Sequence, residues 1–183
     1  MSSKFEMEHN RLFGDLLSVL KEDMAKLTTK ANGGRSILFV YPPEDDEAYI
    51  AESKKRLVGN YEFIDVRAAM TDFISSIGWS DFVETYKDLK NELFFSDRLT
   101  KGTFSCFLMD KIKSAYGSSH IPVLIHAGAI YGTGLCFNNI MERTEIIQSP
   151  LPLIVFYPAA IRDNTIMFLD RQPASKYRCI VIT

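Results

Sequence analysis

The sequence of 183 residues contains no run of about 18 apolar residues, the length that a membrane-spanning helix needs. Its first twenty residues carry charges throughout and include no apolar segment of the signal-peptide kind. Its three cysteines are odd in number and widely spaced, which is more typical of small buried side chains than of a disulfide framework. These absences predict a cytoplasmic protein without a membrane partner.

An excess of positive charge is also missing. The chain has 21 Lys and Arg against 23 Asp and Glu, for a formal net charge of -2 and a pI near 5.9. Proteins that bind a phosphate backbone usually carry a basic excess, so direct binding of nucleic acid is not expected. Hydrophobic residues make up 46% of the chain, and a chain of this length buries about 70% of its unfolded surface. We therefore predict one domain, residues 1–183.

The sequence has no Walker A motif, because neither Gly-Lys-Ser nor Gly-Lys-Thr occurs in it. The first strong strand candidate, residues 37–41, is followed by Pro42, Pro43 and the carboxylates at 44–46. Prolines have no backbone N–H to donate, and carboxylates repel phosphate. This turn is therefore unsuited to a nucleoside triphosphate.

Two short apolar runs, residues 121–125 and 151–158, dominate the second half of the chain. They are rich in β-branched or aromatic residues and lack polar alternation, which indicates buried central strands. Helical spacing between them predicts a strand, a helix and a second strand, and such strands lie parallel. Ligands of open α/β sheets bind beyond the carboxyl ends of the strands, where we expect any small-molecule site.

Periodicity places the other elements. Apolar positions three and four residues apart predict an N-terminal helix and a linker within residues 1–34. A second helix is predicted to end at about residue 57. Residues 68–117 are predicted to form a largely helical insertion or crossover, with Ser80 as an N-cap. Residues 61–66 alternate as an edge strand does. Two last strands, 165–169 and 177–182, are candidates for an antiparallel C-terminal edge. The predicted class is α/β, a mainly parallel sheet flanked by helices in the order of a P-loop nucleotide hydrolase.

Histidine and cysteine offer few candidates for catalysis. His126 ends a predicted central strand and is either a general base or metal ligand, or a hydrogen-bonded structural residue. Cys136 is either its nucleophilic partner or a buried thiol. His9 and His120 have no zinc-site spacing. The sequence predicts no catalytic residue, no metal site and no cofactor.

The glycines after the first central strand also have two interpretations. Gly128, Gly132 and Gly134 either offer backbone donors to an anion at a helix start or form a plain turn. The carboxylates at 44–47 either bind a metal or begin a solvated helix. Tyr177 and Arg178 either bind a carboxylate or phosphate group on a partner or form a salt bridge on an edge strand. The candidate ligand or partner site at the strand ends comprises His126, Gly128, Tyr131, Gly132, Gly134, Pro158, Tyr177 and Arg178.

Four segments carry a resemblance to a known family: residues 129–132, 153–158, 167–170 and 177–182. In order and spacing they resemble the BrxB family of bacteriophage-exclusion (BREX) defence systems, and the likeness covers about residues 35–183. The chain departs from the family at Pro158-Ala159-Ala160-Ile161, where the family commonly has Pro-Gly-Glu-Tyr. The stretch after Gly132 also lacks a clear arginine match.

The resemblance implies a small cytosolic, non-enzymatic accessory protein of a phage-defence locus. It also implies contacts with other members of the locus, notably the alkaline-phosphatase-like PglZ component, and a fold that is a degenerate relative of P-loop ATPases. The residues keep a second hypothesis open, a nucleotide- or anion-binding enzyme with its site at the turn 128–134 and His126. They do not indicate an oligomeric state.

Overall fold

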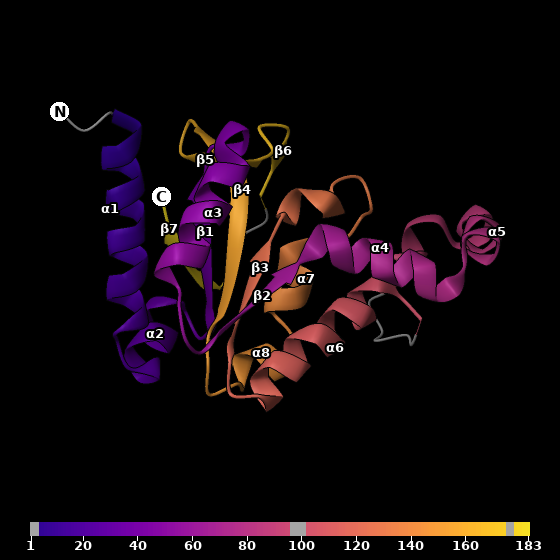
Figure 1. Ribbon diagram of the computed structural model, residues 1–183, viewed down its shortest axis with the longest axis horizontal. Coiled ribbons are helices and arrows are strands. Elements are labelled where there is room, and N and C mark those ends of the chain that lie inside the picture. Colours follow the sequence, from indigo (N-terminus) through magenta and orange to yellow (C-terminus); the bar gives the residue numbers. More distant parts are fainter. Residues whose placement is uncertain (1–3, 96–101, 175–177) are drawn as a thin grey trace.

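The computed structural model describes residues 4–95, 102–174 and 178–183, and within them a parallel sheet forms the centre of the molecule (Figure 1). The strand order is β2-β3-β4-β1-β7, with every neighbouring pair parallel. The predicted α/β class is confirmed, as are the interior positions of β3 and β4 and the edge position of β2. The strands are β1 (Ser36–Tyr41), β2 (Tyr61–Asp65), β3 (Ile121–Ile125), β4 (Leu153–Arg162) and β7 (Cys179–Ile182).

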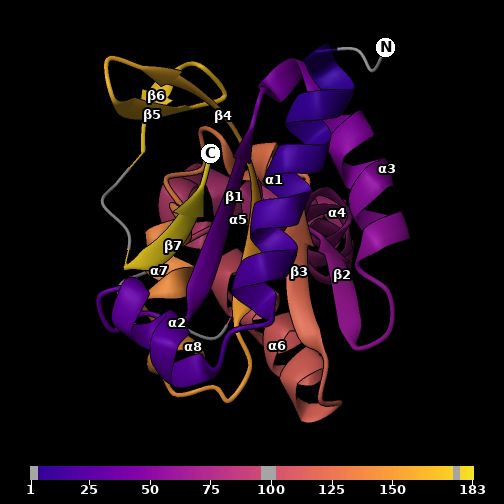
Figure 2. The same cartoon turned by 90° about the vertical axis from the view of Figure 1, so that its left-hand side faces the viewer.

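The central strands are apolar on both sides because helices cover both faces of the sheet (Figure 2). Successive side chains of a strand point to opposite faces. Phe39 of β1 accordingly packs with α1 (Lys4–Leu20), α2 (Met24–Lys30) and α3 (Asp46–Arg56), whereas Leu38 packs with the helices of the other face. The single apolar run of β1 therefore contributes side chains to the hydrophobic cores on both faces of the sheet.

The N-terminal segment is two helices rather than the single helix that its apolar spacing predicts. Helix α1 ends at Leu20, and Asp23 begins α2 by accepting a hydrogen bond from the backbone N–H of Lys26 at 2.9 Å. A side chain that caps a new helix competes with continuation of the old one. The apolar stripe still docks on the sheet, since Leu16 and Leu27 are both buried.

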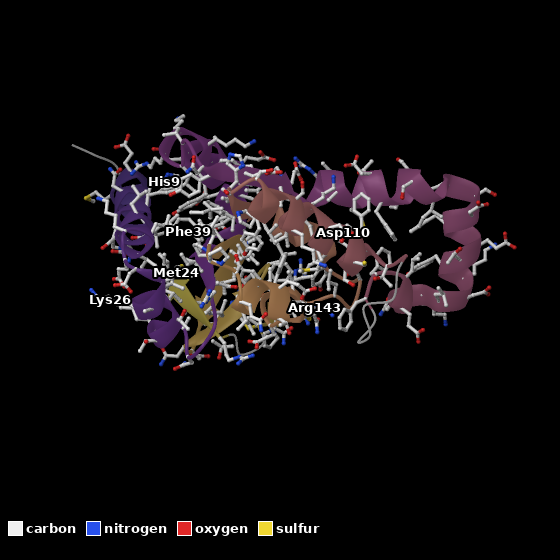
Figure 3. The ribbon with its side chains drawn as sticks, turned by 90° about the horizontal axis from the view of Figure 1, so that it is seen from below. His9, Met24, Lys26, Phe39, Asp110 and Arg143 are labelled. Atoms are coloured by element: carbon white, nitrogen blue, oxygen red, sulfur yellow. The ribbon has the colours of Figure 1, made fainter. Side chains whose placement is uncertain are left out.

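The helical region 68–117 joins β2 to β3 and extends beyond the sheet as an arm (Figures 1 and 3). It consists of α4 (Val66–Ile77), α5 (Trp79–Leu89), the 3-10 turn η2 (Lys90–Leu93) and α6 (Phe104–Gly117). Gly78 has a φ of 89° and lies between α4 and α5 as the N-cap of the latter. The prediction of Ser80 as that cap is wrong, because Ser80 is already inside α5.

The crossover from β3 to β4 contains short pieces in place of an ordinary helix. They are η3 (Ala127–Ile130), α7 (Phe137–Met141) and α8 (Thr144–Ile147). Gly132 and Gly134 have φ of 80° and 81°, a left-handed conformation that interrupts helical structure. The parallel pairing of β3 with β4 agrees with prediction.

The antiparallel edge near the C-terminal end of the chain is present, but its pairing differs from the expectation. The second half of β4 pairs with β5 (Thr165–Phe168), which pairs with β6 (Gln172–Pro173). The final strand, β7, instead joins the main sheet parallel to β1. The expected pairing of the last two strands with each other is therefore wrong.

Candidate functional site

The carboxyl ends of the parallel strands meet at one edge of the sheet, the upper edge in Figure 1, where β4 continues into the β5-β6 hairpin. This is the edge at which open α/β sheets bind ligands. Two features occupy it. A cluster of charged side chains lies beyond β2 and β3, and a pocket lies beyond β1, β4 and β7.

The charged cluster is centred on His126, which follows β3. Its Nδ1 lies 2.9 Å from Oδ2 of Asp65, the last residue of β2, and its Nε2 lies 3.3 Å from Oε1 of Glu47 in α3. The guanidinium of Arg67 lies 3.2 Å from the same Nε2. Arg67 also lies 3.6 Å from Glu47 and 3.8 Å from Asp65. The cluster therefore joins the ends of two strands to the starts of two helices.

His126 is held in place by its backbone as well as by its neighbours. It is 8% exposed and has φ 54° and ψ 42°, a left-handed conformation in which histidine is enriched. A guanidinium only donates hydrogen bonds, so Nε2 accepts from Arg67 when the imidazole is neutral and the proton is on Nδ1. Nδ1 is close to Asp65 but not aligned for a hydrogen bond. The imidazole thus has charged neighbours on both ring nitrogens.

A histidine beside a carboxylate is the arrangement of a general base, but here the second ring nitrogen is covered. In a catalytic pair Nε2 faces the reacting group, whereas Arg67 and Glu47 already contact Nε2 of His126. Oδ1 of Asp65 is also engaged, accepting hydrogen bonds from the backbone N–H groups of Arg67 and Ala68 as the N-cap of α4. These contacts favour the structural interpretation of His126.

The pocket beyond the other strands has a volume of about 360 Å³ and stands where a phosphate loop would follow β1. None of its lining residues is Lys, Arg or His. Three of its side chains carry carboxylates: Glu8, Glu44 and Asp170. The others are Leu12, Val40, Tyr41, Pro42, Pro43, Ala159, Ala160, Ile161 and Thr183.

The charges around this pocket oppose an anionic ligand. Arg11 pairs with Glu8, and Arg162 pairs with Asp170, but Glu44 has no ion pair within the described residues. A negative charge 4 Å from a carboxylate is raised in energy by about 1 kcal/mol in water and about 4 kcal/mol near a protein surface. The dipole of α3 would return only about 0.3–1 kcal/mol. The repulsion by the carboxylate is larger than the attraction by the helix dipole, so the pocket suits an apolar or cationic group.

The acidic stretch 44–47 forms a helix start. It spans η1 (Pro43–Asp45) and the first turn of α3, and the buried hydroxyl of Tyr41 donates a hydrogen bond to Asp46. Burial, reinforced by the charge of Asp46, raises the pKa of the Tyr41 phenol. Across the described residues, no group of three or more His, Cys, Asp or Glu side chains is arranged to hold a metal ion.

The glycine turn after β3 forms several hydrogen bonds of its own. The N–H groups of residues 129, 131 and 133 donate to the carbonyls of His126, Gly128 and Ile130 at 3.0–3.1 Å. Those of residues 135 and 136 donate to the side chains of Thr133 and Asn139. Helix α7, which follows, has only five residues. None of these bonds has the N–H of Gly128, Gly132 or Gly134 as its donor, so the anion-binding interpretation of this turn stays a prediction.

The turn residues border a cavity with aromatic and apolar walls. Tyr131, Gly132 and Gly134 line this space of about 120 Å³ together with Cys136 and residues of β5 and β6. Tyr131 is 50% exposed, and Cys136 is half-buried at the N-cap of α7 rather than fully buried on a helix. The cavity can hold a small apolar group.

Gly128 and Pro158 make close contacts in the same region. A Cβ on Gly128 would lie 3.3 Å from the side chain of Leu169. Buried Pro158 pairs with Tyr41 in the register of β4 and β1, and its carbonyl accepts a hydrogen bond from the N–H of Leu169 at 2.9 Å. Both residues anchor the β5-β6 hairpin above the sheet.

Arg178 lies away from this edge, because it precedes β7 and so belongs to the amino-terminal edge of the parallel sheet. Its Nε donates to Oε2 of Glu142 at 2.6 Å, and its backbone N–H donates to Oε1 of the same residue. Arg178 thus closes a salt bridge, as one of its two interpretations foresaw, and its placement with the strand ends is corrected. Tyr177 lies outside the described residues.

The sequence does not single out Asp65 or Arg67, and it indicates Glu47 only as part of the acidic stretch 44–47. A signal for Asp65 existed, since it ends a predicted strand, and the carboxyl ends of adjacent parallel strands share one edge. Arg67 and Glu47 belong to helix starts, and no sequence spacing relates them to His126. Their proximity depends on which strands become neighbours.

Comparison of the chain with models of protein families, with curated proteins and with solved structures gives no match. No helix in the described part of the chain has the length and apolar character needed to cross a membrane.

Proposed function

We propose that this protein is a non-enzymatic accessory protein that acts through protein–protein contacts. The carboxyl edge of its sheet supports this proposal above all. Where a nucleotide hydrolase has phosphate-binding donors, the pocket beyond β1 has two prolines and three carboxylates. The carboxylate of Glu44, which has no ion pair within the described residues, repels phosphate, and the prolines have no N–H to donate to it.

Two further observations favour an adaptor over an enzyme. The first is that both ring nitrogens of His126 face charged neighbours. The arm formed by α4, α5 and α6 extends well beyond the sheet, which gives a partner an accessible surface (Figure 3).

The cellular setting follows from the resemblance to the BrxB family. We propose that the protein acts in the cytoplasm within a phage-defence system of the BREX type and contacts its PglZ-like component. An affinity-tagged chain, purified from cells that carry the intact locus, should retain the PglZ-like protein. Deletion of the PglZ-like gene is the control for carry-over, and purification without any product of the locus would reject the proposal.

The alternative function, a nucleotide- or anion-binding enzyme at the turn 128–134, has a test of its own. Binding to the folded state at 100 times the dissociation constant stabilises a protein by about 2.7 kcal/mol. A thermal-shift panel of nucleotides, with and without Mg²⁺, should leave the unfolding temperature unchanged if the protein is an adaptor. A shift that Arg67→Ala abolishes would favour the enzyme.

A further inference from the structure

Helix α5 forms the far end of the arm (Figures 1 and 3). It presents large apolar side chains to solvent. Trp79 is 70% exposed, Tyr86 is 42% exposed and Leu89 is 44% exposed. The rings are ordered against the arm's own core, with Phe82 stacked between Trp79 and Tyr86 at centroid distances of 6.0 Å on each side. Aromatic side chains of this kind are enriched at the centres of protein interfaces.

Carboxylates occupy a different side of the same helix. A shallow groove on α5 has an apolar wall, Trp79 and Val83, and an acidic wall, Glu84 and Asp88, with Lys87 between them. Asp81 precedes Glu84 by three residues, and Glu84 precedes Asp88 by four, so all three carboxylates lie on one side of the helix. Within the described residues none of these three carboxylates forms an ion pair.

We infer that this α5 patch, defined by Trp79, Val83, Glu84 and Asp88, docks a basic amphipathic segment of a partner protein. The inference rests on the proposed adaptor function and specifies its contact surface and the chemistry of its partner. An indole face is the best aromatic site for a cation, and carboxylates pair with guanidinium groups. One arginine of the segment would lie over Trp79 and a second, further along, would pair with Glu84 or Asp88, while apolar side chains of the same segment cover Val83.

The carboxylates of the α5 patch disfavour three other binding partners: an uncharged apolar segment, a second copy of this chain and an anionic lipid surface. An uncharged apolar segment would remove the carboxylates from water without giving them partners. A second copy of this chain, packed with its α5 antiparallel to the first about a twofold axis, would bring the two acidic walls against each other. An anionic lipid surface would meet the same repulsion. Only a segment that combines apolar and basic side chains satisfies both walls of the groove.

Fluorescence provides a direct readout, because Trp79 is the one tryptophan of the chain. The probe is a synthetic amphipathic helix with leucine on one face and arginine on the other, and its counterpart has glutamate in place of arginine. We expect the arginine peptide to shift Trp79 emission saturably and the glutamate peptide to leave it unchanged.

Variants with intact Trp79 test the role of charge. Glu84→Lys combined with Asp88→Lys should weaken binding of the arginine peptide about tenfold, equivalent to about 1.4 kcal/mol, and Lys87→Glu should strengthen it. Asp110→Lys changes an exposed carboxylate midway along α6 (Figure 3) and should leave the affinity within about twofold. Val58→Ala, at a side chain that is also 70% exposed but lies before β2, is the apolar control.

Equal binding of both peptides, or unchanged binding by the doubly reversed variant, would overturn the inference. Emission that changes with protein concentration alone, together with a dimer in sedimentation, would identify a second copy as the occupant and overturn it too. Purification from cells separates this inference from the proposed function. If wild type and Trp79→Ala retain the same neighbour, the inference fails and the adaptor stands. If wild type retains none, the adaptor fails and the peptide titration decides the inference.

Discussion

Gly34 lies directly against the backbone of Arg178, so closely that a Cβ on Gly34 would stand 1.7 Å from the carbonyl oxygen of Arg178. This contact brings the linker after α2 against the start of β7, next to the pairing of Ser36 with Cys179. No side chain of any size fits between these two backbone segments. The contact explains why a glycine precedes the first strand.

Replacement of Gly34 by alanine should therefore loosen the edge of the sheet. We expect Gly34→Ala to lower the free energy of unfolding by about 1–3 kcal/mol or more, since the obstacle is backbone and cannot rotate away. Gly14→Ala is the matched control. Gly14 lies inside α1 with nothing within 4 Å of the place that an alanine methyl would take, so alanine there should stabilise the protein by up to about 1 kcal/mol. Urea denaturation measures both, and a neutral Gly34→Ala would contradict the close contact.

Asp65 both caps α4 and lies beside His126, and two substitutions separate these roles. Asp65→Ala should cost about 1–2 kcal/mol of stability, because the N–H groups of Arg67 and Ala68 lose their acceptor. Asp65→Asn keeps a hydrogen-bond acceptor for the same N–H groups and should lower the free energy of unfolding by only a few tenths of a kcal/mol. Chemical denaturation of the two variants distinguishes them. Equal losses would mean that the charge beside His126, rather than the cap, sets the contribution.

Phe39 is fully buried at the centre of the face covered by α1 and α3. Its ring centroid lies 5.0 Å from that of Phe13 and 4.7 Å from that of Phe156. Phe39→Ala should lower the free energy of unfolding by about 3–5 kcal/mol, through lost burial and the cavity that remains. Val58→Ala, at an exposed position, should stay within about 0.5 kcal/mol. Thermal and urea unfolding of the two variants measure these changes. If both variants lost a similar free energy of unfolding, the burial of Phe39 would not be a main source of stability.

Cys179 should make stability depend on alkaline pH. Burial, with a further effect of the charge of Glu142, raises the pKa of its thiol from 9.0 to about 12. The folded state thus keeps a proton that the unfolded state releases, so the contribution of this thiol is complete below about pH 9 and declines as pH rises toward 12. Urea unfolding at about pH 8 and about pH 10 should show a larger loss for wild type than for Cys179→Ala. A parallel decline in the two proteins would contradict the burial of the thiol.

Much of the fold is predictable because β-branched and aromatic runs have few alternatives to central strands. The runs that became β1, β3 and β4 were recognised in this way. The hairpin of β4 with β5 was not recognised, because its turn is made by Asp163 and Asn164, with φ of 47° and 59°, and not by a glycine pair. The partner of β7 was missed since strand pairing over long distances leaves no local pattern.

The candidate site was harder to predict than the fold. Each of its charged residues has an ordinary local role: Asp65 caps a helix, and Glu47 belongs to the acidic start of another. Only the order of the strands brings them to His126. The composition of the glycine turn likewise gives no sign that the N–H groups of residues 129, 131 and 133 bond to carbonyl groups of the same turn. Hydrogen-bond partners of this kind are fixed by three-dimensional geometry rather than by spacing.

Calorimetric titration of the purified chain with ATP in the presence of Mg²⁺ tests most directly whether the strand ends have lost the capacity to bind a nucleotide. We predict only heats of dilution, because prolines and carboxylates surround the position of the phosphates beyond β1. Saturable binding that requires Mg²⁺ would contradict this prediction.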